Sequence, residues 1–232
     1  MIVAIMQPYF LPYIGYWQLL NAVDTFVLFD DVNYIKRGWI NRNRLLENGK
    51  AAYFNIIIQS ASQNRHINDT YRLLDENEES KLLRRITTCY HKAPYFEEIY
   101  PLINAIVMEK ENKLSKYLET SICMVAEYLQ IKTTICNSSD VKKNEWLCGQ
   151  DKIIDICKRL GADTYYNPIG GLGLYDKSVF QKENIRLFFL ESENIHYLQF
   201  GDTFVPSLSI MDVLMFCGKE RTRQFLERYR LK

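Results

Sequence analysis

The sequence predicts an α/β fold with a mainly parallel sheet and flanking helices. Two observations lead to it. Residues 2–6 and 26–29 are short, continuous apolar runs, the pattern of strands buried on both faces. A helical segment expected at 16–23 lies between them, and parallel strands need such a crossover. The same alternation of apolar runs and amphipathic segments returns after residue 133.

The remaining elements follow in order. Residues 34–44 form a basic loop, and residues 53–59 are rich in β-branched side chains, which predicts a strand. Further along the chain, the pattern predicts helices at 82–90, 114–129, 147–160 and 176–183 and strands at 133–136, 164–166 and 185–190. Gly161 suits a helix C-terminus. Ser209 is predicted to cap the last helix, with Asp212 completing a capping box, and residues 218–232 to form a solvated helix.

We expect residues 1–232 to form a single α/β domain with a helical insertion at about 60–130, because no low-complexity linker separates these segments. The longest apolar runs are far shorter than the ~20 residues that cross a bilayer, and the first residues lack the basic start of a signal peptide. A cytoplasmic protein without membrane insertion is therefore expected.

The charge balance narrows the class of partner. With 29 Lys and Arg against 28 Asp and Glu, the net charge of +1 argues against a general nucleic-acid binder. Three dispersed histidines and six cysteines without CxxC spacing predict no metal site. Reduced thiols are expected, with Cys157 and Cys217 in the core. The sequence is compatible with a homodimer.

The loop after the first strand leads into a helix N-terminus, a natural site for phosphate or carboxylate. Gln7, Tyr13, Gly15 and Tyr16 are the candidate ligand-binding residues in this loop. Because Gln7 ends a buried strand, its amide needs a partner. The alternative is a proline-shaped turn that packs aromatic rings into the core.

Asp30 and Asp31 end the second strand and are candidates to hold a divalent cation, position a sugar hydroxyl or act as a base. The alternative is a turn cap paired with Lys36 and Arg37. Adjacent side chains on an extended segment point in opposite directions, so only one carboxylate is expected to face a ligand.

The loop at 34–44 combines cations with aromatic rings, as expected for an anionic ligand with a flat ring. Its candidate binding residues are Lys36, Arg37, Trp39, Asn41 and Arg42. RNA binding and a plain solvated loop are the alternatives.

Three other segments carry weaker signals. His91 lies between two helices and is either a general acid or base or a structural residue. The three glycines of residues 167–173 form either a phosphate loop or an ordinary loop. Ser209 starts a helix and is a candidate phosphate ligand.

Several of these segments resemble the WbqC-like family. The resemblance rests on residues 6–16 (MQPYFLPYIGY), 30–43 (DDVNYIKRGWINRN), 92–96 (KAPYF) and 208–214 (LSIMDVL). The family is bacterial and is often associated with gene clusters for O-antigen and other surface polysaccharides. The resemblance thus implies a role in sugar or glycan-precursor modification.

A more distant similarity connects Tyr13-Ile14-Gly15-Tyr16 with the HxGH signature of nucleotidylyltransferase-like folds, which are Rossmann-like. Both signature histidines are tyrosines here. Tyrosine can donate a hydrogen bond to phosphate, but its pKa of ~10 prevents it from replacing a charged histidine. The similarity implies the fold and nucleotide binding more than nucleotidyl transfer.

These observations lead to a transferase acting on a nucleotide-activated sugar or similar phosphorylated glycan precursor, with acyl or aminoacyl transfer to a sugar amine as the expected reaction. Asp31 or His91 would be the base, Tyr16 would contact the reacting group, and a nucleotide-containing donor would be the cofactor. Nucleotidyl transfer and a non-enzymatic RNA-binding or scaffold role are the alternatives.

Overall fold

The computed structural model describes residues 1–232 and is built on a six-stranded sheet. The spatial order is β10-β9-β8-β1-β2-β7. The bounds are β1 Ile2–Met6, β2 Thr25–Leu28, β7 Thr134–Asn137, β8 Thr164–Pro168, β9 Arg186–Ser192 and β10 Tyr229–Leu231. All strands are parallel except β10, which pairs antiparallel with β9. The predicted α/β class with a mainly parallel sheet is confirmed.

The parallel strands follow a Rossmann-type order. Taken in chain sequence, they lie in space as third, second, first, fourth and fifth, from β7 across to β9. Carboxyl ends of neighbouring parallel strands meet at one edge of the sheet, where ligands bind in such folds. The loops after β1, β2 and β7 are therefore the first places to look for a site.

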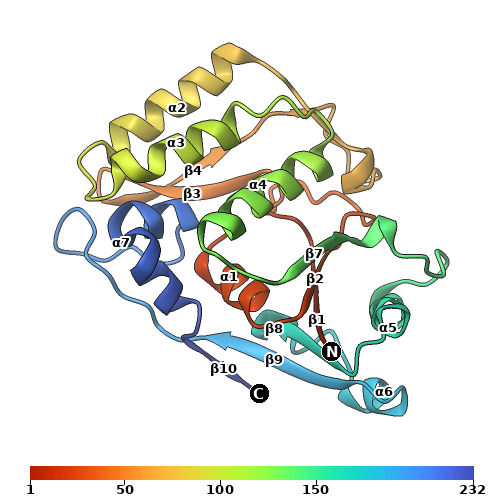
Figure 1. Ribbon diagram of the computed structural model, residues 1–232. Coiled ribbons are helices and arrows are strands. Elements are labelled where there is room, and N and C mark those ends of the chain that lie inside the picture. The colour runs from red at the N-terminus through yellow and green to blue at the C-terminus, as the bar shows by residue number, and fades with distance from the viewer.

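Seven helices accompany this sheet (Figure 1). Their bounds are α1 Ile14–Asn21, α2 Glu76–Tyr90, α3 Phe96–Val107, α4 Leu114–Tyr128, α5 Gly149–Leu160, α6 Lys177–Lys182 and α7 Ile210–Phe225. Alternate β1 side chains enter different cores. Ala4 lies in the large core with α1, α4 and α7, whereas Val3 and Ile5 join the smaller core under α5 and α6. None of the helices is both long and apolar enough to cross a membrane.

Residues 29–133 form one long excursion between β2 and β7. The excursion contains α2 and α4, which overlap the helices expected at 82–90 and 114–129, and α3, for which no separate helix was predicted. It begins earlier than the helical insertion expected at about 60–130 and includes a hairpin, β3 Arg42–Glu47 and β4 Lys50–Asn55. A second pair joins β5 Ile58–Gln59 to β6 Tyr71–Arg72. In Figure 1 the hairpin, α2 and α3 lie at the top, while β9, β10 and both termini lie at the bottom.

Three local predictions need correction. The basic loop stops at Asn41, because Arg42 already belongs to β3, and the strand expected at 53–59 is divided between β4 and β5. Residues 218–232 do not form a solvated helix. Thr222 and Phe225 are buried in α7, and residues 229–231 extend the sheet as β10. The six basic residues of this segment concealed an amphipathic helix turn followed by an edge strand.

The start of α7 behaves only partly as predicted. The Ser209 hydroxyl caps it by accepting a hydrogen bond from the Met211 amide at 3.2 Å. Asp212 does not complete a capping box. Its buried carboxylate accepts hydrogen bonds from Tyr90 at 2.8 Å and from Tyr197 at 2.6 Å. Burial raises the pKa of Asp212, although these hydrogen bonds oppose the shift.

We predict that Gly218→Ala will destabilise the protein by about 2–4 kcal/mol. Gly218 kinks α7 with φ 63° and ψ −171°, a conformation that only glycine adopts readily. An added Cβ would also lie 2.5 Å from the Tyr95 ring. Urea unfolding measures the change. Gly173→Ala is the matched control because its Cβ would meet nothing within 4 Å. Equal stability of the two variants would contradict the prediction.

Candidate functional site

The two aspartates after β2 have different environments. Asp30 is buried and accepts hydrogen bonds from the Ser139 amide at 2.9 Å and the Ser139 hydroxyl at 2.7 Å. Burial raises the pKa of Asp30, and the Ser139 bonds moderate the rise. Asp31 is partly exposed, and its carboxylate accepts a hydrogen bond from the Ser138 hydroxyl. The segment after β7 thus holds both carboxylates.

Two lysines converge on Asp31. The Lys143 ammonium lies 2.8 Å from the Asp31 carboxylate, and the Lys152 ammonium lies 3.0 Å from it. Burial by itself would raise the pKa of Asp31, but hydrogen bonds from Lys143, Ser138 and Lys152 outweigh it, so the pKa is lowered. A carboxylate stabilised in this way is a weak proton acceptor. In this arrangement, Asp31 is suited to positioning the two lysines rather than to accepting a proton.

These groups line a polar cavity of about 750 Å³ at the carboxyl ends of β2 and β7. Of its 13 lining residues, one is hydrophobic. Lys142, Lys143, Lys152 and Arg159 supply positive charge, and the aspartates at 31, 69 and 140 with Glu145 balance it. Lys142 is exposed and takes no part in the ion pairs around Asp31, so its ammonium is free to meet a ligand.

Two amides near this edge have unused acceptors. The side-chain oxygen of Asn68, which lines the cavity, is buried without a hydrogen-bond partner. The oxygen of Asn137, at the end of β7, is also buried and unpartnered. Unpaired buried acceptors cost free energy unless a donor reaches them. A hydroxyl-bearing ligand would supply such donors to Asn68.

The loop after β1 is held tightly against the insertion and α7. Tyr16 is buried and its hydroxyl donates to the Gln7 carbonyl at 3.2 Å. Burial raises the pKa of Tyr16 well above its ordinary value. Ser209 is also buried, and its hydroxyl donates to the Leu11 carbonyl at 2.8 Å. Tyr16 and Ser209 therefore stabilise the loop and do not line the lysine-rich cavity.

Tyr13 lies at the surface of the same loop. It is 40% exposed, and its ring covers Gly15 so closely that a Cβ there would lie 2.5 Å from a ring carbon. Glycine at position 15 is therefore what lets Tyr13 lie across the start of α1. Gln7 is partly exposed at the end of β1.

A smaller cavity of about 160 Å³ lies beside Tyr13. Its lining joins the loop after β1 to the basic loop and to β3, through Tyr9, Pro12, Tyr13, Trp39, Asn43, Arg44 and Ser207. Of the basic-loop candidates, Trp39 is the one that lines it. The Arg42 guanidinium lies 4.4 Å from the centre of the Tyr53 ring, and the Asn41 amide donates to the Ile56 carbonyl at 2.9 Å. Lys36 and Arg37 are exposed on the connecting turn.

The structure does not bring His91 to either cavity. The residue ends α2, is exposed, and lines a separate depression with Cys89 and Glu47. Its ring nitrogen lies 3.1 Å from the Thr87 carbonyl of its own helix. The glycine-rich segment at 167–173 is likewise occupied by its own chain, because the Asn167 amide fills the space beside Gly171.

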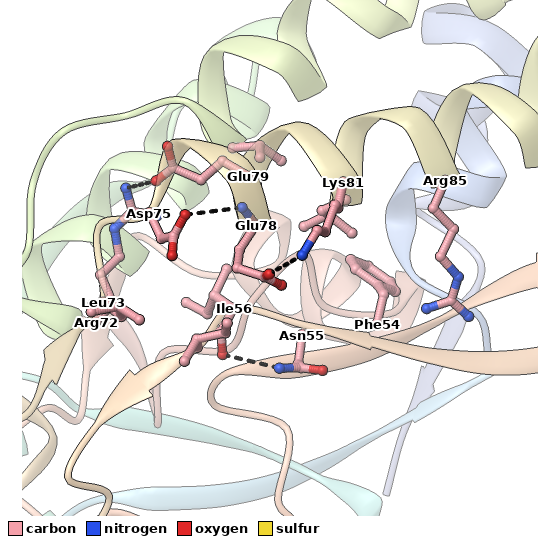
Figure 2. Close-up of a pocket in the computed structure, with 13 residues that line it drawn as sticks. Phe54, Asn55, Ile56, Arg72, Leu73, Asp75, Glu78, Glu79, Lys81 and Arg85 are labelled. Carbon is pink, nitrogen blue, oxygen red and sulfur yellow. Dashed lines mark hydrogen bonds and ion pairs between the residues drawn. The ribbon is translucent and has the colours of Figure 1, made fainter.

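A further pocket lies inside the insertion, between α2 and β4 (Figure 2). Its charged groups already have partners within the chain. Arg72 and Glu79 form a buried ion pair at 3.0 Å, and the Arg72 guanidinium also lies 4.1 Å from the centre of the Tyr117 ring. Arg85 pairs with Glu47 at 2.8 Å. These contacts join the insertion helices to its strands, so the pocket is best explained as a structural joint.

The sequence is similar to a known protein family and to one described relative. Residues 7–224 match the WbqC-like protein family. The chain belongs to the WbqC-like family. It is also 28% identical over 225 residues to a Mycobacterium tuberculosis protein described as uncharacterized protein Rv1507c, covering 94% of each chain. No solved structure matches the sequence.

For this WbqC-like chain, sequence reasoning missed the lysines of the larger cavity. Lys142 and Lys143 follow β7, and Lys152 lies in α5, whereas Asp31 comes more than a hundred residues earlier. The available signal was the Lys142-Lys143 pair in the segment that follows a predicted parallel strand. Loops at such positions converge at the carboxyl edge.

We expect Asp31→Asn to lower the free energy of unfolding at pH 7 by about 1–3 kcal/mol, because two buried ammonium groups lose their carboxylate. The folded-state pKa of Asp31 is lowered, so its stabilisation is complete above the ordinary value of 3.8 and disappears as pH falls through the folded pKa. The difference between wild type and variant should therefore shrink in acid.

Chemical denaturation at several pH values measures this difference. Asp202→Asn is the matched control, because Asp202 is exposed on a loop away from both lysines. A difference for Asp31→Asn that stays constant down to acid pH would show that the ion pairs contribute nothing.

Proposed function

We propose that this protein is a transferase acting on a nucleotide-activated sugar or similar phosphorylated glycan precursor, bound in the larger cavity. The observation that carries the proposal is the composition of that cavity. An exposed lysine and two lysines gathered by Asp31 stand beside an amide oxygen without a partner. Ammonium groups bind phosphate, and amide oxygens accept hydrogen bonds from sugar hydroxyls.

The position of the cavity supports the proposal as well. It lies beyond the carboxyl ends of neighbouring parallel strands, where ligands of open α/β sheets bind. Its lining is almost wholly polar, which suits a hydroxylated and charged ligand better than an apolar one. The association of WbqC-like proteins with surface-polysaccharide gene clusters points to the same substrate class.

Transfer to a sugar amine requires a base that removes a proton from the attacking nitrogen. His66 is the one imidazole that lines the larger cavity, and we assign it this role in the proposal. Imidazole is the side chain that most often serves as a general base. Asp31, an ionised carboxylate paired with Lys143 and Lys152, would instead hold these two lysines toward the phosphate. The transferred group that we propose to test first is an acyl or aminoacyl group carried as an ester or thioester. The nitrogen would attack its carbonyl carbon, the alcohol or thiol of the donor would leave, and the proton taken by His66 would pass to that leaving group.

The binding step predicts a specific effect of Lys142→Ala. Removing one ammonium that meets phosphate should weaken binding of a hexose 1-phosphate or a nucleotide-sugar about tenfold. Titration calorimetry of the purified chain measures the affinity. Lys92→Ala is the matched control, because Lys92 is also exposed but follows α2 and does not line this cavity.

Two results would overturn the proposal. One is the absence of binding heat with every phosphorylated sugar at millimolar concentration. The other is an affinity unaffected by Lys142→Ala. For the reaction, the bound nucleotide-sugar is incubated with acyl and aminoacyl donors and analysed by mass spectrometry. A product heavier by the acyl group is expected, and His66→Gln should slow its formation while leaving the calorimetric affinity unchanged.

A further inference from the structure

Three aromatic residues line the smaller cavity. Tyr9 and Tyr13 come from the loop after β1, and Trp39 comes from the basic loop. Two of these rings pack on other aromatic side chains: Tyr9 packs on Tyr16 with ring centres 5.7 Å apart, and Trp39 packs on Tyr53 with ring centres 6.1 Å apart. Trp39 and Tyr13 are nonetheless 37% and 40% exposed. Exposed aromatic side chains around an open space are suited to stacking on a flat ring.

The polar groups of this cavity include an unused donor. The Arg44 guanidinium lies 5.5 Å from the centre of the Trp39 ring and donates to the Ser207 carbonyl at 2.7 Å. Its Nε, however, is buried without a hydrogen-bond partner. The guanidinium has only donors and no acceptor, so the edge of a ligand beside it must present an oxygen or nitrogen lone pair. Such lone pairs lie in the plane of a nucleobase, at its edge.

The walls are fixed before any ligand arrives. Asn43 donates to the carbonyls of Phe10 and Leu11 at 3.1 and 2.9 Å, which ties the loop of Tyr9 and Tyr13 to the strand of Arg44. The Ser209 amide donates to the Arg44 carbonyl at 2.9 Å and closes the third side. A preformed cavity of this kind binds a ring without the entropic cost of assembling its walls.

We propose that this aromatic cavity is a second binding site, which takes the nucleobase of a nucleoside or nucleotide between Trp39 and Tyr13, with the Arg44 guanidinium beside its edge. The assignment deepens the proposed function and rests on it in one respect: the base would belong to the nucleotide-activated substrate. The cavity itself stands on geometry separate from that of the lysine-lined one.

Tryptophan fluorescence tests the assignment. The chain has three tryptophans: Trp17 is fully buried, Trp146 is 95% exposed on the loop before α5, and Trp39 lines the cavity. Trp146→Phe leaves the cavity intact and makes Trp39 the accessible reporter. Uridine, cytidine, adenosine and guanosine are titrated as nucleosides, because without phosphate they do not report on the lysines. Saturable quenching by at least one of them is expected.

A second variant tests how much the Trp39 ring contributes to nucleoside affinity. Trp39→Leu should weaken nucleoside binding, measured by calorimetry, at least about fivefold, the effect of losing one base–aromatic stack. Lys142→Ala should leave nucleoside affinity unchanged. Circular dichroism and retained binding of hexose 1-phosphate show that Trp39→Leu is folded. If it does not fold, Tyr13→Leu replaces it, because Tyr13 lies at the surface.

The outcomes separate the two proposals. Quenching by no nucleoside, equal affinity in Trp39→Leu, or quenching by methyl glycosides but not nucleosides would overturn the nucleobase site. Nucleoside binding sensitive to Trp39→Leu, with no binding of hexose 1-phosphate, would leave this site standing and overturn the proposed function. Binding of hexose 1-phosphate without binding of any nucleoside would overturn the nucleobase site and leave the proposed function standing.

Discussion

The carbonyl of Leu11 accepts hydrogen bonds from both Asn43 and Ser209, and the rest of the architecture depends on this junction. It joins three segments that are far apart in the chain: the loop after β1, strand β3 of the insertion and the start of α7. Leu11 adopts a positive φ of 43°, so the turn that presents its carbonyl is itself strained. Because all three contributing segments are buried there, the insertion is fixed over the carboxyl edge of the sheet.

This fixation explains why two cavities form where they do. The segment from Asp30 to Asn41 leaves β2 beside the lysines and returns to β3 beside Trp39, so one stretch of chain contributes to both. At its start, Asp31 gathers lysines that would otherwise repel each other. At its end, the ring of Trp39 rests on the β3–β4 hairpin. Charge and aromatic surface are thus separated along a single loop.

The central sheet could be predicted from the sequence, because β1 and β2 are continuous apolar runs. The end of α5 could be predicted as well, because Gly161 adopts the φ of 71° that favours glycine. The last strand, β10, could not be predicted, because its three residues, Tyr229–Leu231, are too few to show an apolar run and stand among basic side chains. Of the candidate residues in the N-terminal motif and the basic loop, Tyr13 and Trp39 line one cavity. The burial of Tyr16 and Ser209 depends on tertiary contacts that no local pattern contains. The same is true of Lys152 meeting Asp31, since that contact exists only after α5 packs against β2.

The place of β1 at the centre of the sheet has a consequence for biosynthesis. The ribosome makes the central strand first, but its neighbour β8 begins at Thr164. Until then β1 and β2 expose apolar surface and an unpaired strand edge, and the junction at Leu11 lacks Ser209. Such distant pairing makes folding slow and leaves nascent chains prone to aggregation. In a chain of this topology, one edge of the central strand therefore stays unpaired until β8 has been made.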